Sequence, residues 1–150
     1  TEAELLASDY IANGQVYYIF RNFPFEDNNS SIKSSDQAAN ASMCANEQGH
    51  FWDYHAMLYA NQDTSSAAAY SDRRLIAFAD ALGLDMDQFR SCFTNNTYGA
   101  EIQEDIDRAS EYGVNGTPSV FVNGQRITPG YVPAYSDLVS AIDGALLPTE

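Results

Sequence analysis

The sequence predicts an α/β domain in which a long helical stretch separates an N-terminal strand from a C-terminal β-hairpin. Residues 15–21 are β-branched and aromatic, as in a strand. Residues 35–112 carry apolar side chains at helical spacing, and residues 119–128 form two short runs around an Asn-Gly turn. The expected order is helix, strand, several helices, strand, strand and helix, within one domain spanning residues 1–150.

The composition indicates a folded protein and excludes some partners. Apolar residues make up 45% of the chain, which is typical of globular proteins. The 7 basic and 21 acidic residues give a net charge of −14. Such a charge argues against nucleic acid, whose binding depends on Lys and Arg, and against anionic membrane surfaces.

The N-terminal part is expected to contribute one helix and one strand. Residues 1–13 place Leu5, Leu6, Tyr10 and Ile11 at helical spacing, and Gly14 is expected to end the helix. Residues 15–21 (QVYYIFR) then form the strand, and the polar residues 22–35 form a surface loop.

The middle of the chain is predicted to be helical apart from a loop at 62–70. Asp85 is expected to cap one of these helices, because a carboxylate at that position accepts hydrogen bonds from free backbone N–H groups. The helices expected from the pattern cover residues 35–48, 50–61, 71–82, 86–93 and 98–112.

The C-terminal part is predicted to be a hairpin followed by a helix. Gly113 suits the left-handed position that ends a helix. Asn123-Gly124 favours a type I′ turn between strands at 119–122 and 125–128, because both central residues of that turn need positive φ. Pro133 is expected in the first turn of the last helix, where its missing N–H costs nothing.

Thr117-Pro118 stands immediately before the first hairpin strand. An ordinary trans proline opening a strand would explain it. The run GVNGTPSVFVNG, however, resembles the cis-proline loop and hairpin of the thioredoxin superfamily, most closely the DsbA-like disulfide oxidoreductases of bacterial cell envelopes. The resemblance covers nearly the whole chain. It implies a catalytic role for Thr117 and Pro118 beside redox cysteines, and substrate binding by Gly116, Thr117 and Pro118.

The same resemblance implies a thioredoxin-like fold with an inserted helical subdomain. Residues 1–33 and 111–150 would form the thioredoxin core, and residues 34–110 the insertion. The family fold begins with a central strand, followed by a helix that carries Cys-x-x-Cys, and this sequence begins within that helix. Losing the strand would leave buried backbone groups unpaired. Three explanations stay open, the first preferred: a fragment lacking its start, a strand supplied by another chain, or a different strand pairing.

The two cysteines, Cys44 and Cys92, are 48 residues apart and so do not form a Cys-x-x-Cys redox motif. Two buried thiols that act as small apolar groups would explain them. The resemblance instead implies a structural disulfide that links two helices of the insertion.

Other candidate residues have simpler explanations. His50 and His55 lack the spacing and the partners of a zinc site, so no metal is expected, and His55 is expected to be half-buried. Glu47 is expected to be a solvated carboxylate without a role. The aromatic residues of the 50–61 helix are expected to form its buried face, with a substrate groove as the alternative: Phe51, Trp52, Tyr54 and Tyr59.

The resemblance implies a function in thiol–disulfide exchange on envelope or secreted proteins, in a bacterial extracytoplasmic compartment. It implies no cofactor. The partners that the resemblance implies are reduced or unfolded envelope proteins, together with a membrane redox partner. Residues 1–150 alone are expected to be inactive, because they contain no Cys-x-x-Cys. The alternatives are a redox-inactive peptide-binding module and a glutathione-linked isomerase or transferase. The sequence just upstream of Thr1 would discriminate among the three.

Overall fold

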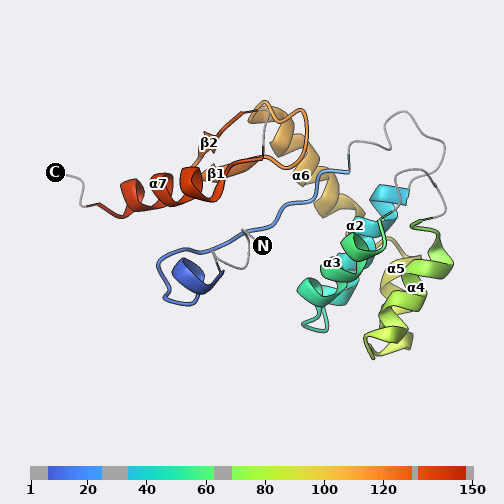
Figure 1. Cartoon of the computed structure of the whole chain (residues 1–150). Helices are drawn as coiled ribbons and strands as arrows, with labels where there is room; N and C mark the ends of the chain where they lie inside the picture. The colour runs from blue at the N-terminus through green and yellow to red at the C-terminus, as the bar shows by residue number, and fades with distance from the viewer. Residues whose placement is uncertain (1–6, 25–33, 63–68, 130–131, 148–150) are drawn as a thin grey trace. The chain divides into compact units, whose positions relative to one another are not determined.

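A computed structural model describes residues 7–24, 34–62, 69–129 and 132–147 (Figure 1). The chain divides into two compact units, which we call the hairpin unit (1–21 and 113–150) and the helical unit (22–112). The sequence places the corresponding boundaries at 33/34 and 110/111. In the structure, Asn22 lies in the helical unit, where its N–H donates a 3.1 Å hydrogen bond to the buried carboxylate of Asp105.

The helical unit contains the helices that the sequence predicts, with ends that agree within two residues. Its helices are α2 (Ser34–Asn46), α3 (Phe51–Ala60), α4 (Asp72–Ala81), α5 (Met86–Thr94) and α6 (Gly99–Glu111). The predicted cap is confirmed, because the Asp85 carboxylate accepts hydrogen bonds from the N–H groups of Asp87 and Gln88, each 3.0 Å long. Within the described ranges, no helix is long and apolar enough to cross a membrane.

The core of the helical unit forms around α2, which contacts each of the other four helices. Ala41 and Ala45 of α2 are completely buried, and their small side chains let neighbouring helices approach closely. Large side chains from three other helices fill the remaining space: Tyr54 of α3, Leu75 of α4 and Phe89 of α5 are also completely buried.

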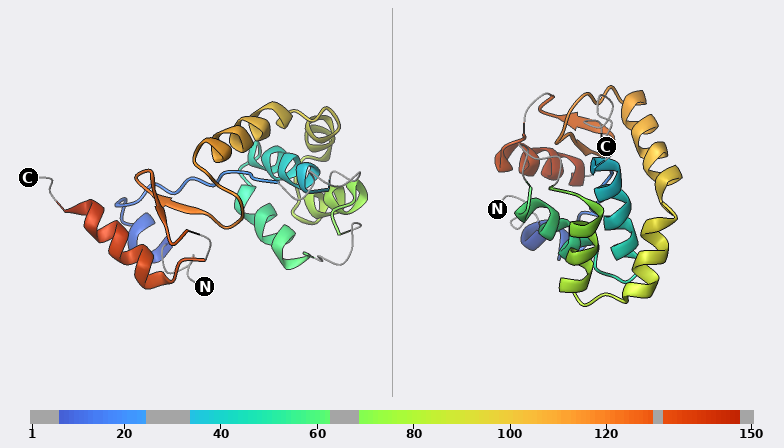
Figure 2. Two further views of the ribbon diagram at one scale, coloured as in Figure 1. Left: turned by 90° about the horizontal axis from the view of Figure 1, so that it is seen from above. Right: turned by 90° about the vertical axis from the view of Figure 1, so that its right-hand side faces the viewer.

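The hairpin unit contains η1 (Ala7–Ile11), β1 (Val120–Val122), β2 (Gln125–Ile127) and α7 (Tyr135–Leu146). The strands pair antiparallel, and Asn123 (φ 47°) and Gly124 (φ 82°) confirm the predicted turn. Helix α7 contacts both strands and lies along the hairpin (Figure 2). Pro133 precedes the helix rather than entering it, because α7 begins at Tyr135 after the N-cap residue Ala134.

The strand predicted over residues 15–21 is wrong. Residues 16–24 are described without strand structure, and the sheet found in the described ranges consists of β1 and β2. The side chain of Tyr17 is 89% exposed and that of Ile19 is 55% exposed. β-Propensity reflects how well residues fit a half-buried pleated surface. This segment has the composition of a strand, but it is not paired as a strand among the described residues.

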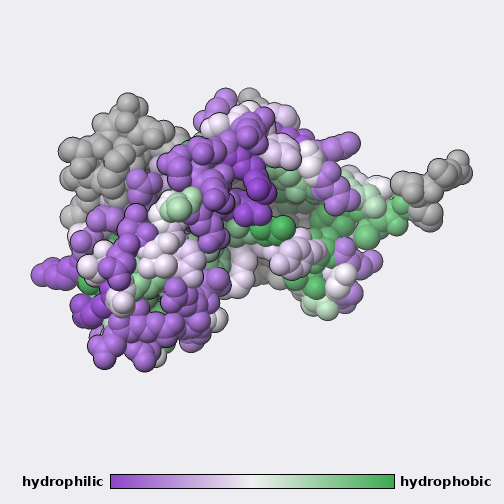
Figure 3. All heavy atoms as spheres, turned by 180° about the vertical axis from the view of Figure 1, so that it is seen from behind, coloured by the Kyte–Doolittle hydropathy of each residue, from purple (hydrophilic) through white to green (hydrophobic). Residues whose placement is uncertain are grey.

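The hairpin unit exposes several large apolar side chains. Figure 3 shows hydrophobic residues gathered over this unit, whereas hydrophilic residues cover most of the visible helical unit. The large apolar or aromatic side chains exposed on the hairpin unit are Tyr17, Tyr18, Ile19, Val132, Leu146 and Leu147. The helical unit therefore has the more complete core of the two.

Candidate functional site

The candidate site is the loop from Gly113 to Ser119 in the hairpin unit. Gly113 follows the end of α6 and has a φ of 66°, the left-handed conformation predicted for it. The peptide bond between Thr117 and Pro118 is cis, and both residues are exposed, whereas Gly116 is half-buried. Strand β1 begins two residues after Pro118, so the proline does not interrupt the strand pairing.

Hydrogen bonds from β2 hold this loop. The Arg126 guanidinium donates through Nη1 to the Gly113 carbonyl at 3.1 Å and through Nη2 to the Ser119 hydroxyl at 2.9 Å. The Ser119 hydroxyl in turn donates to the Gly116 carbonyl at 2.7 Å. The loop backbone is therefore fixed on both sides of the exposed Thr117-Pro118 pair. An exposed backbone of this kind can pair with an extended peptide.

Ser119 and Arg126 are not among the site residues predicted from the sequence. The Asn-Gly turn in the sequence nevertheless pointed towards Arg126. The Asn-Gly turn fixes the hairpin register, which pairs Arg126 with Phe121 of β1. A cation placed at that position in a short return strand can reach the segment that enters β1. The loop was identified from its own residues, while its support comes from the neighbouring strand.

Two tyrosines of the hairpin unit donate hydrogen bonds to carboxylates. The Tyr135 hydroxyl donates to Asp9, and this hydrogen bond raises the pKa of Tyr135 to about 12. The Tyr10 hydroxyl donates to Asp143 at 2.9 Å, which likewise raises the pKa of Tyr10. Both pairs link η1 to α7, so they serve to connect the two ends of the hairpin unit.

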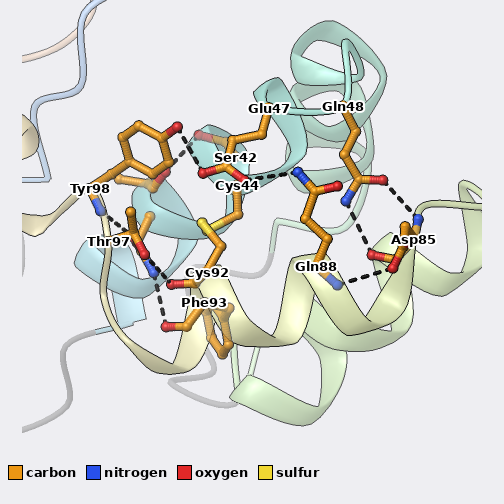
Figure 4. The surroundings of a disulfide bond; sticks show 12 residues. Ser42, Cys44, Glu47, Gln48, Asp85, Gln88, Cys92, Phe93, Thr97 and Tyr98 are labelled. Atoms are coloured by element: carbon orange, nitrogen blue, oxygen red, sulfur yellow. Dashed lines mark hydrogen bonds between the residues drawn. A yellow bond between two sulfur atoms is a disulfide. The ribbon is translucent and has the colours of Figure 1, made fainter.

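In the helical unit, a disulfide joins Cys44 of α2 to Cys92 of α5 (Figure 4). This is the pairing that the resemblance implied. Cys44 is completely buried and Cys92 is 6% exposed. Both cysteines of the sequence are used in this bond, so residues 1–150 offer no thiol for exchange chemistry.

Polar side chains beside the disulfide tie the same helices together, as Figure 4 shows. Glu47 was expected to have no role, but its carboxylate accepts hydrogen bonds from the Tyr98 hydroxyl at 3.0 Å and from Gln88 at 3.1 Å. Gln48 binds the backbone of Asp85 in both directions, donating to its carbonyl at 3.1 Å and accepting from its N–H at 2.7 Å. These contacts are structural.

The aromatic residues of α3 divide between core and surface. Tyr54 is completely buried and donates to the Leu75 carbonyl at 2.8 Å, so the core prediction is confirmed for it. The prediction is wrong for Trp52 and Tyr59, which are 52% and 60% exposed. His55 is half-buried as expected, with its ring centroid 4.5 Å from that of Tyr59. Burial lowers the pKa of His55, which favours the neutral imidazole.

Metal ligands do not gather in the described part of the chain, where no group of three or more His, Cys, Asp or Glu side chains is placed to hold an ion. The candidate loop contains none of these residue types either. The loop therefore contains no metal-ligating side chain, and Thr117 and Pro118 are its exposed pair before β1.

Comparison with known proteins assigns the architecture. A family model described as Thioredoxin matches residues 1–143. The order of elements, with helices inserted between the N-terminal segment and the hairpin, is that of a thioredoxin-like α/β fold with a helical insertion. No solved structure gives a significant match.

Two similar proteins carry the name probable disulfide bond formation protein D. The protein from Bacillus anthracis is 28% identical over 143 residues, which cover 94% of this chain and 63% of that protein. The protein from Bacillus cereus is 27% identical over 128 residues, or 84% of this chain and 58% of that protein.

A third relative has a different name. A protein of Salinispora tropica named Na(+)/H(+) antiporter NhaA 3 is 37% identical over 111 residues. The match covers 74% of this chain but 16% of that protein. This chain thus spans about a sixth of the antiporter-named relative and about three fifths of the disulfide bond formation proteins.

Proposed function

Because this chain belongs to the thioredoxin family, as a DsbA-like member, we propose that it is part of a protein thiol–disulfide oxidoreductase acting on envelope or secreted proteins. The observation that carries the proposal is the similarity along 94% of the chain to a protein named for disulfide bond formation. The exposed loop at Thr117-Pro118 agrees with it, since the loop offers backbone to an extended substrate.

The chemistry is thiol–disulfide exchange on a Cys-x-x-Cys that lies outside residues 1–150. In the oxidising direction, a client thiolate attacks one sulfur of the Cys-x-x-Cys disulfide, and that S–S bond breaks as a mixed disulfide forms. A second client thiolate then displaces the enzyme sulfur. The client gains a disulfide, and its two electrons and two protons pass to the enzyme, which leaves as the dithiol. The reducing direction reverses these steps.

The residues of this chain serve to bind and orient the client. Thr117 offers its backbone to the extended segment that carries the client cysteine, and Pro118 and Gly116 shape the loop. The buried Cys44–Cys92 disulfide stabilises the helical unit and takes no part in exchange.

The proposed partners are reduced or unfolded proteins of the bacterial envelope, with a membrane redox protein as the possible electron partner. An extracytoplasmic location agrees with the disulfide, because disulfides persist in oxidising compartments. The charge of −14 disfavours nucleic acid as a partner. The antiporter name describes a relative of which this chain covers 16%, so we do not carry ion transport over.

The full-length protein tests the proposal. We expect it to catalyse the oxidative refolding of reduced ribonuclease or the reduction of a client disulfide. Replacing its Cys-x-x-Cys with Ser should abolish the activity. As the matched control, the double variant Cys44→Ala/Cys92→Ala should retain exchange at a temperature where it stays folded. Turnover by a polypeptide of residues 1–150 alone would contradict the assignment.

A second candidate function is a redox-inactive module that binds extended peptides. It is favoured by the combination of an exposed loop with cysteines that are both held in a disulfide. The same assay separates the two functions, because the module would bind peptide without any turnover by the full-length protein.

A further inference from the structure

We infer that Arg126 is a positioning residue, which holds the loop of residues 113–119 in the shape that receives the client peptide. This inference rests on the proposed function, because it assumes that the Thr117-Pro118 loop is the docking surface. It adds a residue outside the loop, on the returning strand β2, that determines how the loop is presented.

The geometry of the contact suits an arginine. A guanidinium is planar and presents several N–H donors in a fixed fork. In this structure two different nitrogens bind two different anchors, the Gly113 carbonyl and the Ser119 hydroxyl. A lysine ammonium in the same place is a compact point charge on a flexible stem, so it would hold one anchor at the expense of the other.

The direction of the hydrogen bonds makes Ser119 a relay. A guanidinium can only donate, so the Ser119 hydroxyl must accept from it. The one hydroxyl proton is then left to donate to the Gly116 carbonyl, at 2.7 Å. Gly116 directly precedes Thr117, so the contact fixes the peptide unit that enters the proposed docking residue.

Arg126 therefore acts on the loop more than on the hairpin. The Asn-Gly turn and the contacts with α7 already define the hairpin. Thr117 and Pro118 are exposed, so packing does little to hold them. The Nε atom of Arg126 is buried and has no hydrogen-bond partner among the described residues. An unpaired buried donor lowers the stability of the fold.

The test compares Arg126→Lys with wild type in the full-length protein, using two substrates. One is a ten-residue uncharged peptide with two cysteines, and the other is dithiothreitol, which needs no backbone docking. We expect the KM for the peptide to rise about tenfold, because one charge-assisted hydrogen bond is lost. The kcat should change by less than about twofold. The rate with dithiothreitol should not change.

Two further variants serve as a second probe and a control. Ser119→Ala removes the relay without touching the charge, and it should raise the peptide KM in the same direction. The double variant Arg126→Lys/Ser119→Ala should raise the peptide KM by less than the product of the two single-variant increases, because both substitutions act on one contact. Arg90→Lys changes an exposed arginine of α5 in the same way and should leave both substrates unaffected.

The outcomes are distinct. An unchanged peptide KM in both Arg126→Lys and Ser119→Ala would overturn the inference, as would an equal loss with peptide and dithiothreitol. If the wild type exchanges with neither substrate, the proposed oxidoreductase function fails. The loop is then tested by NMR titration with the same peptide, where about tenfold weaker binding by Arg126→Lys is expected, and equal affinity would overturn the inference.

Discussion

Two tyrosines on one helix show how strongly the surroundings of a residue determine its role. Tyr54 is completely buried in the helical unit, whereas Tyr59 of the same helix is 60% exposed. Burial raises the pKa of Tyr54, whose hydroxyl donates to the Leu75 carbonyl at 2.8 Å. Identical substitutions at the two positions should therefore have different effects.

Tyr54→Phe is expected to lower the free energy of unfolding by about 1 kcal/mol, because it removes a buried hydrogen bond while keeping the ring. Tyr59→Phe should change it by less than about 0.5 kcal/mol, as is usual at the surface. Urea denaturation of both variants measures the difference. Equal unfolding midpoints would show that the Tyr54 hydroxyl contributes nothing.

Tyr135 gives a prediction about pH. Its hydrogen bond to Asp9 raises its pKa from 10.0 to about 12, so the folded protein favours the neutral phenol. The resulting stabilisation is fully present below pH 10 and is lost as the pH rises from 10 to about 12.

Asp9→Asn should lower the pKa of Tyr135 towards its ordinary value of 10.0. The absorbance of tyrosinate at 295 nm, compared between wild type, Asp9→Asn and Tyr135→Phe, follows this titration. If Tyr135→Phe removes a component that titrates near ~10 in the wild type, the hydrogen bond does not act as described.

At the scale of the element, the disulfide between α2 and α5 is the strongest single constraint. It spans 48 residues and lies in the core of the helical unit. Closing a loop of that length restricts the unfolded chain and stabilises the fold by up to about 4 kcal/mol in the loop-entropy model. In the double variant Cys44→Ala/Cys92→Ala, the free energy of unfolding should fall by up to that amount.

Urea unfolding with and without a reducing agent tests this prediction. The wild type should lose stability when reduced, whereas the double variant should be indifferent to the reductant. A wild type that unfolds at the same urea concentration in both conditions would show that the disulfide is not a source of stability.

The sequence predicted those elements whose causes are local. Asp85 caps α5 through N–H groups two and three residues away, and Asn123-Gly124 forms its turn from its own φ values. The prediction of a strand over residues 15–21 was wrong, because a strand depends on a neighbouring strand that local composition does not reveal. The exposure of Trp52 and the contact of Arg126 with Gly113 likewise depend on residues distant along the chain.

The candidate site divides in the same way. A short motif predicts Gly116, Thr117 and Pro118 as site residues, and this remains a prediction; in the structure they lie just before β1. The Asn-Gly turn gives the hairpin register, but the register alone does not show that Arg126 reaches Gly113 and Ser119, so the Ser119 relay was not predicted.

At the scale of the whole molecule, the two units differ in how well they are packed. The main cluster of buried apolar residues extends from Ala38 to Cys92 and lies entirely in the helical unit. In the described part of the hairpin unit, Leu138 and Ile142 of α7 and the neighbouring Pro133 are buried. A two-stranded hairpin is marginally stable in water without further packing, and within the described residues α7 supplies that packing. We therefore expect the hairpin unit of residues 1–150 to open more readily than the helical unit.

Hydrogen exchange tests this difference in a polypeptide of residues 1–150. Amides of β1 and β2 are expected to exchange at least about 100-fold faster than those in the middle of α2, because local opening requires less free energy where fewer apolar contacts are lost. Mass spectrometry of peptides from the two regions gives both rates in one sample. Equal protection of the hairpin and α2 would mean that the two units unfold together, and that the exposed side chains of Tyr17 and Ile19 do not mark a weaker unit.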